Sequence, residues 1–267
     1  MHGIGNDFVM IDRMKAADES IDWSALSVSM CDRKFGVGAD GLILAEPGKD
    51  TQFAMRMFNP DGSESEMCGN GVRCFALFVR DKGHTANTEI PVETGAGLLH
   101  LSIEDDGQVK VDMGVAKLPR GEIGMAGSPD ERFINQPLEG FDLNGTAVSM
   151  GNPHVVIFTD DVAAIPLEQI GPQIECHPLF PARVNVHFVQ IVERDHIVQR
   201  TWERGAGITL ACGTGACACA VASFLNGYTD RSVDIDLPGG RLHIEYHENG
   251  RVDMTGPAVT VFEADWK

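Results

Sequence analysis

Two cysteines, Cys68 and Cys212, occupy the same short motif, Cys-Gly-X-Gly, and an apolar helical pattern follows each of them. The first backbone N–H groups of a helix lack internal partners and carry the positive end of the helix dipole, so they attract a carboxylate. The same position usually lowers the pKa of a cysteine from about 8.5 to between about 3.5 and 7.5. We therefore expect a reactive thiol and a carboxylate site at each of the two helix starts.

The two motifs belong to an internal repeat with a period of about 145 residues. Residues 5–11 align with residues 151–157, and residues 56–59 align with residues 200–203. Because these matches and the two cysteine motifs keep nearly the same offset, the chain is predicted to contain two copies of one domain.

One thiol in each copy suits the inversion of a stereocentre next to a carboxylate. One cysteine, as a thiolate, would remove the proton, and the other, as a thiol, would return a proton to the opposite face. Hydrogen bonds from both helix starts to the carboxylate would stabilise the carbanion. This chemistry requires no cofactor, and the gaps from Cys68 to Cys74 and from Cys212 to Cys217 match no standard zinc or iron–sulfur spacing, so no metal is expected.

The elements that must position these cysteines follow an α+β pattern, in which each half is a strand-rich sheet holding one principal helix. The principal helices are expected at 71–82 and 215–226, and a shorter helix is expected near 166–174. Strands are expected at 53–58, 90–93, 98–103, 109–113, 155–158, 185–192, 198–203, 233–237, 242–246 and 251–255.

The domain boundaries follow from the same pattern. Pro119 and the glycines after it are expected to form a linker, and a last strand at 259–263 could return to the first sheet. We therefore expect an N-terminal domain of residues 1–112 with 258–267, and a C-terminal domain of residues 113–257.

Composition narrows the class of protein. The net charge of −18 is spread along the chain, which argues against nucleic acid or an anionic membrane as a partner. No apolar stretch approaches the roughly 20 residues of a membrane span, and the N-terminus lacks the pattern of a signal peptide. We therefore expect a soluble, cytoplasmic protein.

The other cysteines are expected to be structural. Seven is an odd number, which favours reduced thiols over a disulfide framework. Cys31 and Cys176 stand alone and are expected to be small buried side chains, and Cys74, Cys217 and Cys219 are expected in the cores of the two helices.

A dinucleotide site is the main alternative from a different class. Residues 213–218 fit the pattern G-x-G-x-x-A at the start of a helix, and Asp234 and Asp236 follow about 20 residues later. The chain lacks the alternation of strands and helices that this site requires, and the first copy has the larger Cys74 at the third small position. The two-thiol interpretation therefore remains the stronger one.

Four long motifs resemble the diaminopimelate epimerase family. They are MHGIGNDF at 1–8, FNPDGSESEMCGNGVRC at 58–74, GNPH at 151–154 and WERGAGITLACGTGACA at 202–218. The resemblance covers essentially the whole chain and implies cofactor-independent interconversion of LL- and meso-2,6-diaminopimelate, on the route to lysine and peptidoglycan. It also implies an α/β roll of two similar domains, each a rolled mixed sheet around a central helix, with the site in the cleft between them, and a homodimer.

The resemblance also implies roles for individual residues. Cys68 and Cys212 would be catalytic, and the N–H groups of the segments Gly69-Asn70 and Gly213-Thr214 would bind the reacting carboxylate. His154 and Glu203 would tune the thiols. The residues that would hold the rest of the substrate are Asn6, Asn59, Asn152, Asn185, Glu203 and Arg204.

Three positions depart from the family pattern. The chain starts directly at Met1, so the first strand is expected to be short or missing. Gly41 replaces a glutamine of some relatives, and Ile208 replaces a polar residue or proline.

Another two-thiol racemase, for proline or hydroxyproline, is the close alternative. The bidentate guanidinium of Arg204 beside Glu203 favours a substrate with a second amino-acid head group.

Overall fold

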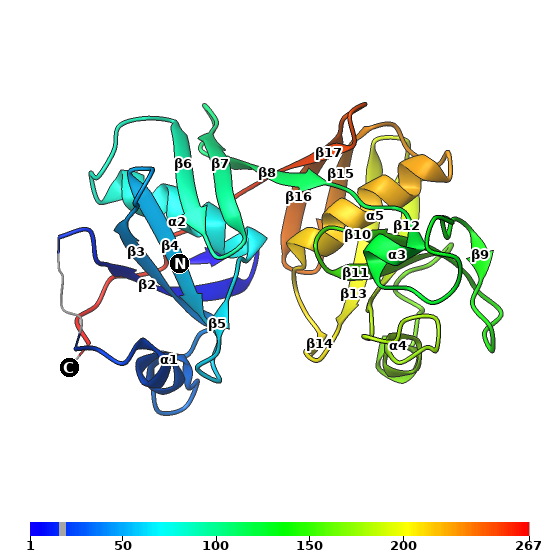
Figure 1. Ribbon diagram of the computed structural model, residues 1–267, viewed down its shortest axis with the longest axis horizontal. Coiled ribbons are helices and arrows are strands. Elements are labelled where there is room, and N and C mark those ends of the chain that lie inside the picture. The colour runs from blue at the N-terminus through cyan, green and yellow to red at the C-terminus, as the bar shows by residue number, and fades with distance from the viewer. Residues whose placement is uncertain (16–19, 267) are drawn as a thin grey trace. The chain divides into compact units, whose positions relative to one another are not determined.

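The computed structural model describes residues 1–15 and 20–266, which fall into two compact units (Figure 1). The first unit comprises Met1–Asp112 and the segment that begins at Thr255, and the second comprises Met113–Met254. Pro119 therefore does not lie in a linker. It lies inside the second unit, where it is the N-cap of the short helix α3 (Arg120–Ile123).

The first unit contains a mixed sheet. Its strands are β1 (His2–Gly3), β2 (Asn6–Asp12), β3 (Gly41–Pro47), β4 (Phe53–Phe58), β5 (Glu64–Ser65), β6 (Glu89–Thr94) and β7 (Gly97–Ile103), and β8 (Val109–Val115) begins in this unit and ends in the second. Its helices are α1 (Trp23–Cys31) and α2 (Gly69–Asp81). β2 pairs with β3 in parallel, β3 with β4 antiparallel, β4 with β6 in parallel, and β6 with β7 antiparallel.

The second unit repeats this pairing order. Besides α3 it contains β9 (Gln136–Pro137), β10 (Asn144–Ser149), β11 (Pro153–Phe158), β12 (Asn185–Glu193), β13 (His196–Glu203), β14 (Gly207–Ile208), β15 (Ser232–Leu237), β16 (Gly240–Tyr246), α4 (Leu167–Glu175) and α5 (Gly213–Leu225). The last strand, β17 (Arg251–Gly256), begins in this unit and ends in the first. β11 pairs with β12 in parallel, β12 with β13 antiparallel, β13 with β15 in parallel, and β15 with β16 antiparallel. The predicted α+β fold of two similar halves is confirmed.

Each sheet surrounds one central helix. Every residue of α2 from Gly69 to Val79 is buried, and α5 is buried from Gly213 to Ser223 with the exception of Thr214. In Figure 1, α5 runs across the strands of its own unit, and it contacts β10 to β13, β15 and β16. No helix in the described ranges has the length and apolar composition that a bilayer crossing needs.

The segment after β17 completes the first unit without forming the predicted strand at 259–263. Val259 forms a single antiparallel bridge with His2, in which each backbone N–H donates to the other's carbonyl at 2.9 Å. The first strand, β1, was expected to be short or missing, and it has two residues.

A buried arginine joins α2 to this segment. The Arg73 side chain is fully buried, and it donates to the Gly69 carbonyl at 3.2 Å and to Asn70 Oδ1 at 2.8 Å. Its Nε donates to the Pro257 carbonyl at 3.3 Å. Because buried acceptors must be satisfied, Arg73 fixes both the first turn of α2 and the return of the chain to the first unit.

Replacing this arginine is expected to weaken the first unit. Arg73→Met keeps much of the side-chain length but leaves buried acceptors without a donor, so the free energy of unfolding should fall by about 3 kcal/mol. Urea unfolding measures this change. Arg80→Met, the same replacement at a partly exposed position of α2, is the control and should change it by less than about 0.5 kcal/mol. Equal stability of the two variants would contradict the role given to Arg73.

Candidate active site

In the first unit, Cys68 is the N-cap residue at which the chain passes from an extended conformation into α2. Its thiol donates to Asn6 Oδ1 over 3.5 Å, and Asn70 Nδ2 donates to the same oxygen at 3.2 Å. The structure therefore brings together three predicted site residues that come from β2 and from the start of α2.

An ion-pair cluster next to β2 orients Asn6. Asn6 Nδ2 donates to Asp40 Oδ2 at 2.7 Å, and Arg33 Nη2 lies 2.7 Å from carboxylate oxygens of both Asp7 and Asp40. Burial alone would raise the pKa of Asp7, but the hydrogen bonds from Arg33 and Asp40, together with the positive charge of Arg33, outweigh burial and lower that pKa. Because a carboxylate can only accept, Asp40 fixes the Asn6 amide with its oxygen toward Cys68.

In the second unit, Cys212 is the N-cap residue of α5 and is 5% exposed. Its sulfur lies 3.8 Å from Thr214 Oγ1. Burial raises the pKa of Cys212 well above its ordinary value, and the negative charge of Glu203 raises it further. The prediction of a lowered pKa at this helix start is therefore wrong for Cys212, because burial and Glu203 outweigh the attraction of the helix N–H groups.

Two histidines form a buried network beneath α5. His154 Nδ1 lies 2.9 Å from His187 Nε2, and His154 Nε2 lies 2.8 Å from Asn152 Oδ1. At the other end, His187 Nδ1 lies 2.9 Å from Thr201 Oγ1. Burial lowers the pKa of His187 to about 3 and lowers that of His154 well below its ordinary value, so both rings are neutral at pH 7.

The other predicted residues lie at the ends of strands or directly after them. Asn185 Nδ2 donates to the Pro153 carbonyl, and its Oδ1 accepts the Arg204 N–H, both at 2.9 Å. Glu203 accepts a hydrogen bond from Thr209 Oγ1 at 2.6 Å. In the first unit, Asn59 Nδ2 donates to Ser63 Oγ at 2.9 Å within its own turn, so Asn59 lies in a different local setting from its counterpart Glu203.

The remaining cysteines are mostly as expected. Cys31, Cys74, Cys217 and Cys219 are buried, and all seven cysteines are free thiols. Cys176 is exposed, because it follows the last turn of α4 at the C-cap, so its predicted burial is wrong. No three His, Cys, Asp or Glu side chains among residues 1–15 and 20–266 form a group that could hold a metal ion.

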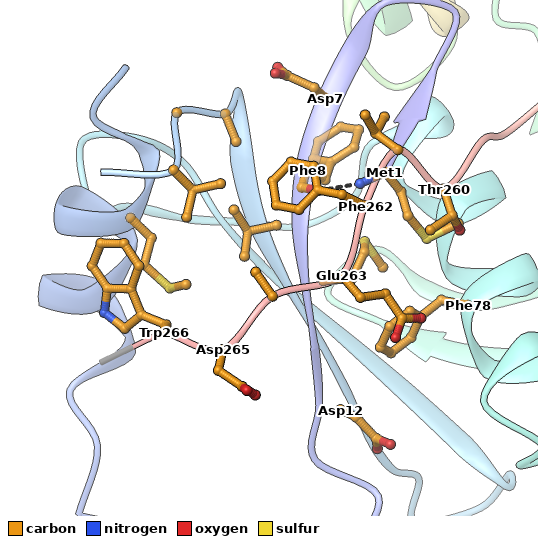
Figure 2. A pocket seen from close by; sticks show the side chains of 18 of the residues that line it. Met1, Asp7, Phe8, Asp12, Phe78, Thr260, Phe262, Glu263, Asp265 and Trp266 are labelled. Carbon is orange, nitrogen blue, oxygen red and sulfur yellow. Dashed lines mark hydrogen bonds between the residues drawn. The ribbon is translucent and has the colours of Figure 1, made fainter. Parts of the chain in front are cut away.

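A cavity of about 730 Å³ lies elsewhere in the first unit, between β2 and the C-terminal segment. Figure 2 shows Phe8, Phe78, Phe262 and Trp266 around it, together with several carboxylates. None of the predicted site residues lines this cavity, so it is separate from the cysteine loops.

Comparison with known proteins identifies relatives over the whole chain. The sequence model of one family, described as diaminopimelate epimerase, matches residues 1–119 and 146–261. Diaminopimelate epimerase 1 of Nostoc sp. is 53% identical, over 98% of this chain and 96% of that protein. Diaminopimelate epimerase of Pelotomaculum thermopropionicum is 50% identical, over 99% and 96%.

Solved structures of lower identity share the fold. A PhzF-family phenazine biosynthesis protein of Bacillus anthracis matches with a TM-score of 0.69 and 16% identity, over 96% of this chain and 91% of that one. A hydroxyproline epimerase of Agrobacterium vitis matches with a TM-score of 0.64 and 14% identity, over 96% and 86%.

The neutral histidine pair is expected to make stability depend on pH. In the unfolded chain both histidines bind protons below about pH 6.5, whereas the folded pair does not. The free energy of unfolding should therefore fall as the pH drops from 6.5 to 4.5, by up to about 1.4 kcal/mol per pH unit for each histidine. Urea unfolding at several pH values measures this slope. His187→Ile should reduce it, and an unchanged slope in that variant would contradict the burial of a neutral His187.

Proposed function

The chain belongs to the diaminopimelate epimerase family, and from this premise we propose that it interconverts LL- and meso-2,6-diaminopimelate without a cofactor. The protein is accordingly an isomerase. The observation that carries the proposed chemistry is the pair Cys68 and Cys212, which begin the two central helices in the same conformation in both units.

The reaction proposed for this pair is a two-base proton transfer. The thiolate of one cysteine takes the α-proton, so the substrate C–H bond breaks and an S–H bond forms. The electron pair left on carbon delocalises into the carboxylate, which the first-turn N–H groups of Gly69-Asn70 and Gly213-Thr214 would stabilise. The thiol of the other cysteine then delivers a proton to the opposite face and becomes the thiolate, so each turnover exchanges the two protonation states.

The side chains next to Cys68 and those next to Cys212 are proposed to have different roles. The raised pKa of Cys212 keeps it as a thiol at pH 7, which is the form that donates a proton. Glu203 and His154 are the proposed tuning residues, and Glu203 acts on Cys212 directly through its charge. In the first unit Asn6 accepts from the Cys68 thiol, so Asn6 is proposed to hold that sulfur at its working position.

The remaining part of the substrate is assigned to polar groups at the ends of strands. Asn152 directly precedes β11, and Asn185, the first residue of β12, pairs with His154 of β11. Arg204 follows β13, is exposed, and its backbone is fixed by Asn185. We propose that Arg204 binds the distal carboxylate through its guanidinium fork, and that Asn59, Asn152 and Asn185 bind the polar groups of the substrate.

We also propose a cytoplasmic location and a small molecule as the binding partner. Seven free thiols fit a reducing cytoplasm, and the net charge of −18 opposes nucleic acid or an anionic membrane as a partner. The small-molecule substrate would serve the formation of lysine and of peptidoglycan precursors.

The proposed assembly is a homodimer. Sedimentation velocity of the purified protein should give twice the chain mass at micromolar concentration. A species of one chain mass across that range would contradict the proposal.

The two-thiol mechanism predicts exchange with solvent. In deuterated water, wild-type turnover of LL-diaminopimelate should place deuterium at the inverted α-carbon of the meso product. Cys68→Ala and Cys212→Ala should each lower kcat/KM by at least about 100-fold, because each removes one proton-transfer group. Mass spectrometry and chiral chromatography of the product measure both effects.

The control is Cys176→Ala, which removes an exposed thiol outside both motifs and should keep wild-type activity. Wild-type turnover in either single variant at Cys68 or Cys212 would exclude the mechanism. Turnover of proline or hydroxyproline in place of diaminopimelate would exclude the substrate while leaving the mechanism intact.

A further inference from the structure

Because the two units are repeats, the strand residues beneath each central helix can be compared position by position. Phe8 pairs with Gly41 across β2 and β3, and His154 pairs with Asn185 across β11 and β12. Two residues further along β3 and β12, Ile43 and His187 therefore occupy equivalent positions. The register with the next strand agrees, because Ile43 lies opposite Met57 and His187 lies opposite Thr201.

The same four positions are apolar in one unit and polar in the other. In the first unit they are Phe8, Ile43, Met55 and Met57, and in the second unit they are His154, His187, Gln199 and Thr201. All eight side chains are at most 5% exposed. Apolar residues therefore suffice to support a central helix in this fold, and packing alone does not explain the polar set.

The polar set also carries a cost that the apolar set avoids. Burying polar groups is unfavourable unless each finds a partner. Gln199 Oε1 is buried and has no hydrogen-bond partner among the residues that the structure describes. A network kept despite this cost is more readily explained by what it does for the neighbouring site than by stability.

His187 lies directly beneath the first turn of α5. A Cβ atom added at Gly215 would lie 2.3 Å from His187 Cε1 and 3.0 Å from Cys212 Sγ. At the equivalent Gly71 the nearest atom would be Ile43 Cδ1, at 2.8 Å. Only glycine at 215 leaves room for the imidazole ring, which therefore lies next to the proposed catalytic thiol.

The hydrogen bonds of the network have a single direction when both rings are neutral. Asn152 Oδ1 accepts, so His154 carries its proton on Nε2 and its Nδ1 must accept. His187 must then donate from Nε2 to His154 Nδ1, and its own Nδ1 accepts from Thr201 Oγ1. Gln199 Nε2 donates to the same Thr201 oxygen at 2.9 Å, which leaves the hydroxyl proton free to point at His187.

We propose that His187 is a positioning residue of the second half-site. By donating to His154 Nδ1 it holds His154 in the Nε2–H tautomer, and His154 in turn holds the Asn152 oxygen toward the network. The Asn152 NH₂ group is thereby directed away from the network, where it can donate to an acceptor on the substrate. The effect on catalysis rests on the proposed function, whereas the tautomer does not.

The first test needs no substrate. In protein labelled with ¹⁵N-histidine, long-range ¹H–¹⁵N spectra at pH 7 should show His154 as the Nε2–H tautomer. His187→Gln retains an N–H donor near the position of Nε2 and should keep this tautomer, whereas His187→Ile, which copies the first unit, should leave His154 in a mixture of tautomers. A wild-type His154 that is protonated on Nδ1, or on both nitrogens, would overturn the proposal even if His187→Ile does not fold.

The second test separates positioning from packing. His187→Ile should raise KM for LL-diaminopimelate about tenfold, the size expected for one misdirected hydrogen bond, with a smaller change in kcat. His187→Gln should stay within about threefold of wild type. Ile43→Val is the matched control, because it changes packing at the equivalent position without touching a hydrogen bond, and it should leave KM unchanged. Equal KM values in wild type and His187→Ile would overturn the proposal.

If the protein turned over no diaminopimelate while His154 showed the expected tautomer and the expected response to His187→Ile, the proposed function would fail and the positioning role would stand. Normal turnover with the opposite tautomer would give the reverse result. The two proposals therefore fail by different measurements.

Discussion

The buried starts of α2 and α5 are the constraint on which the rest of the structure depends. A helix that begins inside a sheet has first-turn N–H groups that cannot all reach water, and they need an acceptor. Cysteine is the N-cap in both units, and its sulfur is a much weaker acceptor than the oxygen of serine, aspartate or asparagine. In the proposed reaction, a substrate carboxylate would supply a stronger acceptor, and its reacting carbon would then lie next to a thiol.

The two units solve the same packing problem with different side chains. Around Cys68 the polar groups lie beside the helix start, where Asn6 links the thiol to Asp40 and Arg73 holds Asn70. Around Cys212 they lie beneath it, where His154 and His187 replace apolar residues of the first unit. The duplicated backbone thus supplies two equivalent positions, and the buried polar groups make their chemical environments unequal. The proposed two-thiol reaction would require such a difference, because one thiol must donate a proton while the other accepts one.

Much of the fold followed from the sequence because the repeat and the strand patterns are local or periodic. The helices begin two residues earlier than predicted, since Gly69-Asn70 and Gly213-Thr214 carry no apolar periodicity. The candidate site was only partly accessible from the sequence. Asp40 approaches Asn6 through the parallel pairing of β2 with β3, and His187 approaches His154 through β11 and β12, and neither residue belongs to a recognisable motif. The alternation of residues along β12 assigns His187 to the core. Only the structure shows that its side chain has polar partners there, His154 and Thr201. The raised pKa of Cys212 was missed because a helix-start argument does not include the depth of burial.

The return of the chain to the first unit has a consequence for synthesis on the ribosome. The second unit is one continuous stretch, Met113–Met254, whereas the first requires residues on both sides of it. The Pro257 carbonyl that Arg73 binds and the Val259 backbone that pairs with His2 leave the ribosome only after the whole second unit has been made. The first unit can therefore be completed only after the second unit has been synthesised, although most of its residues are made first.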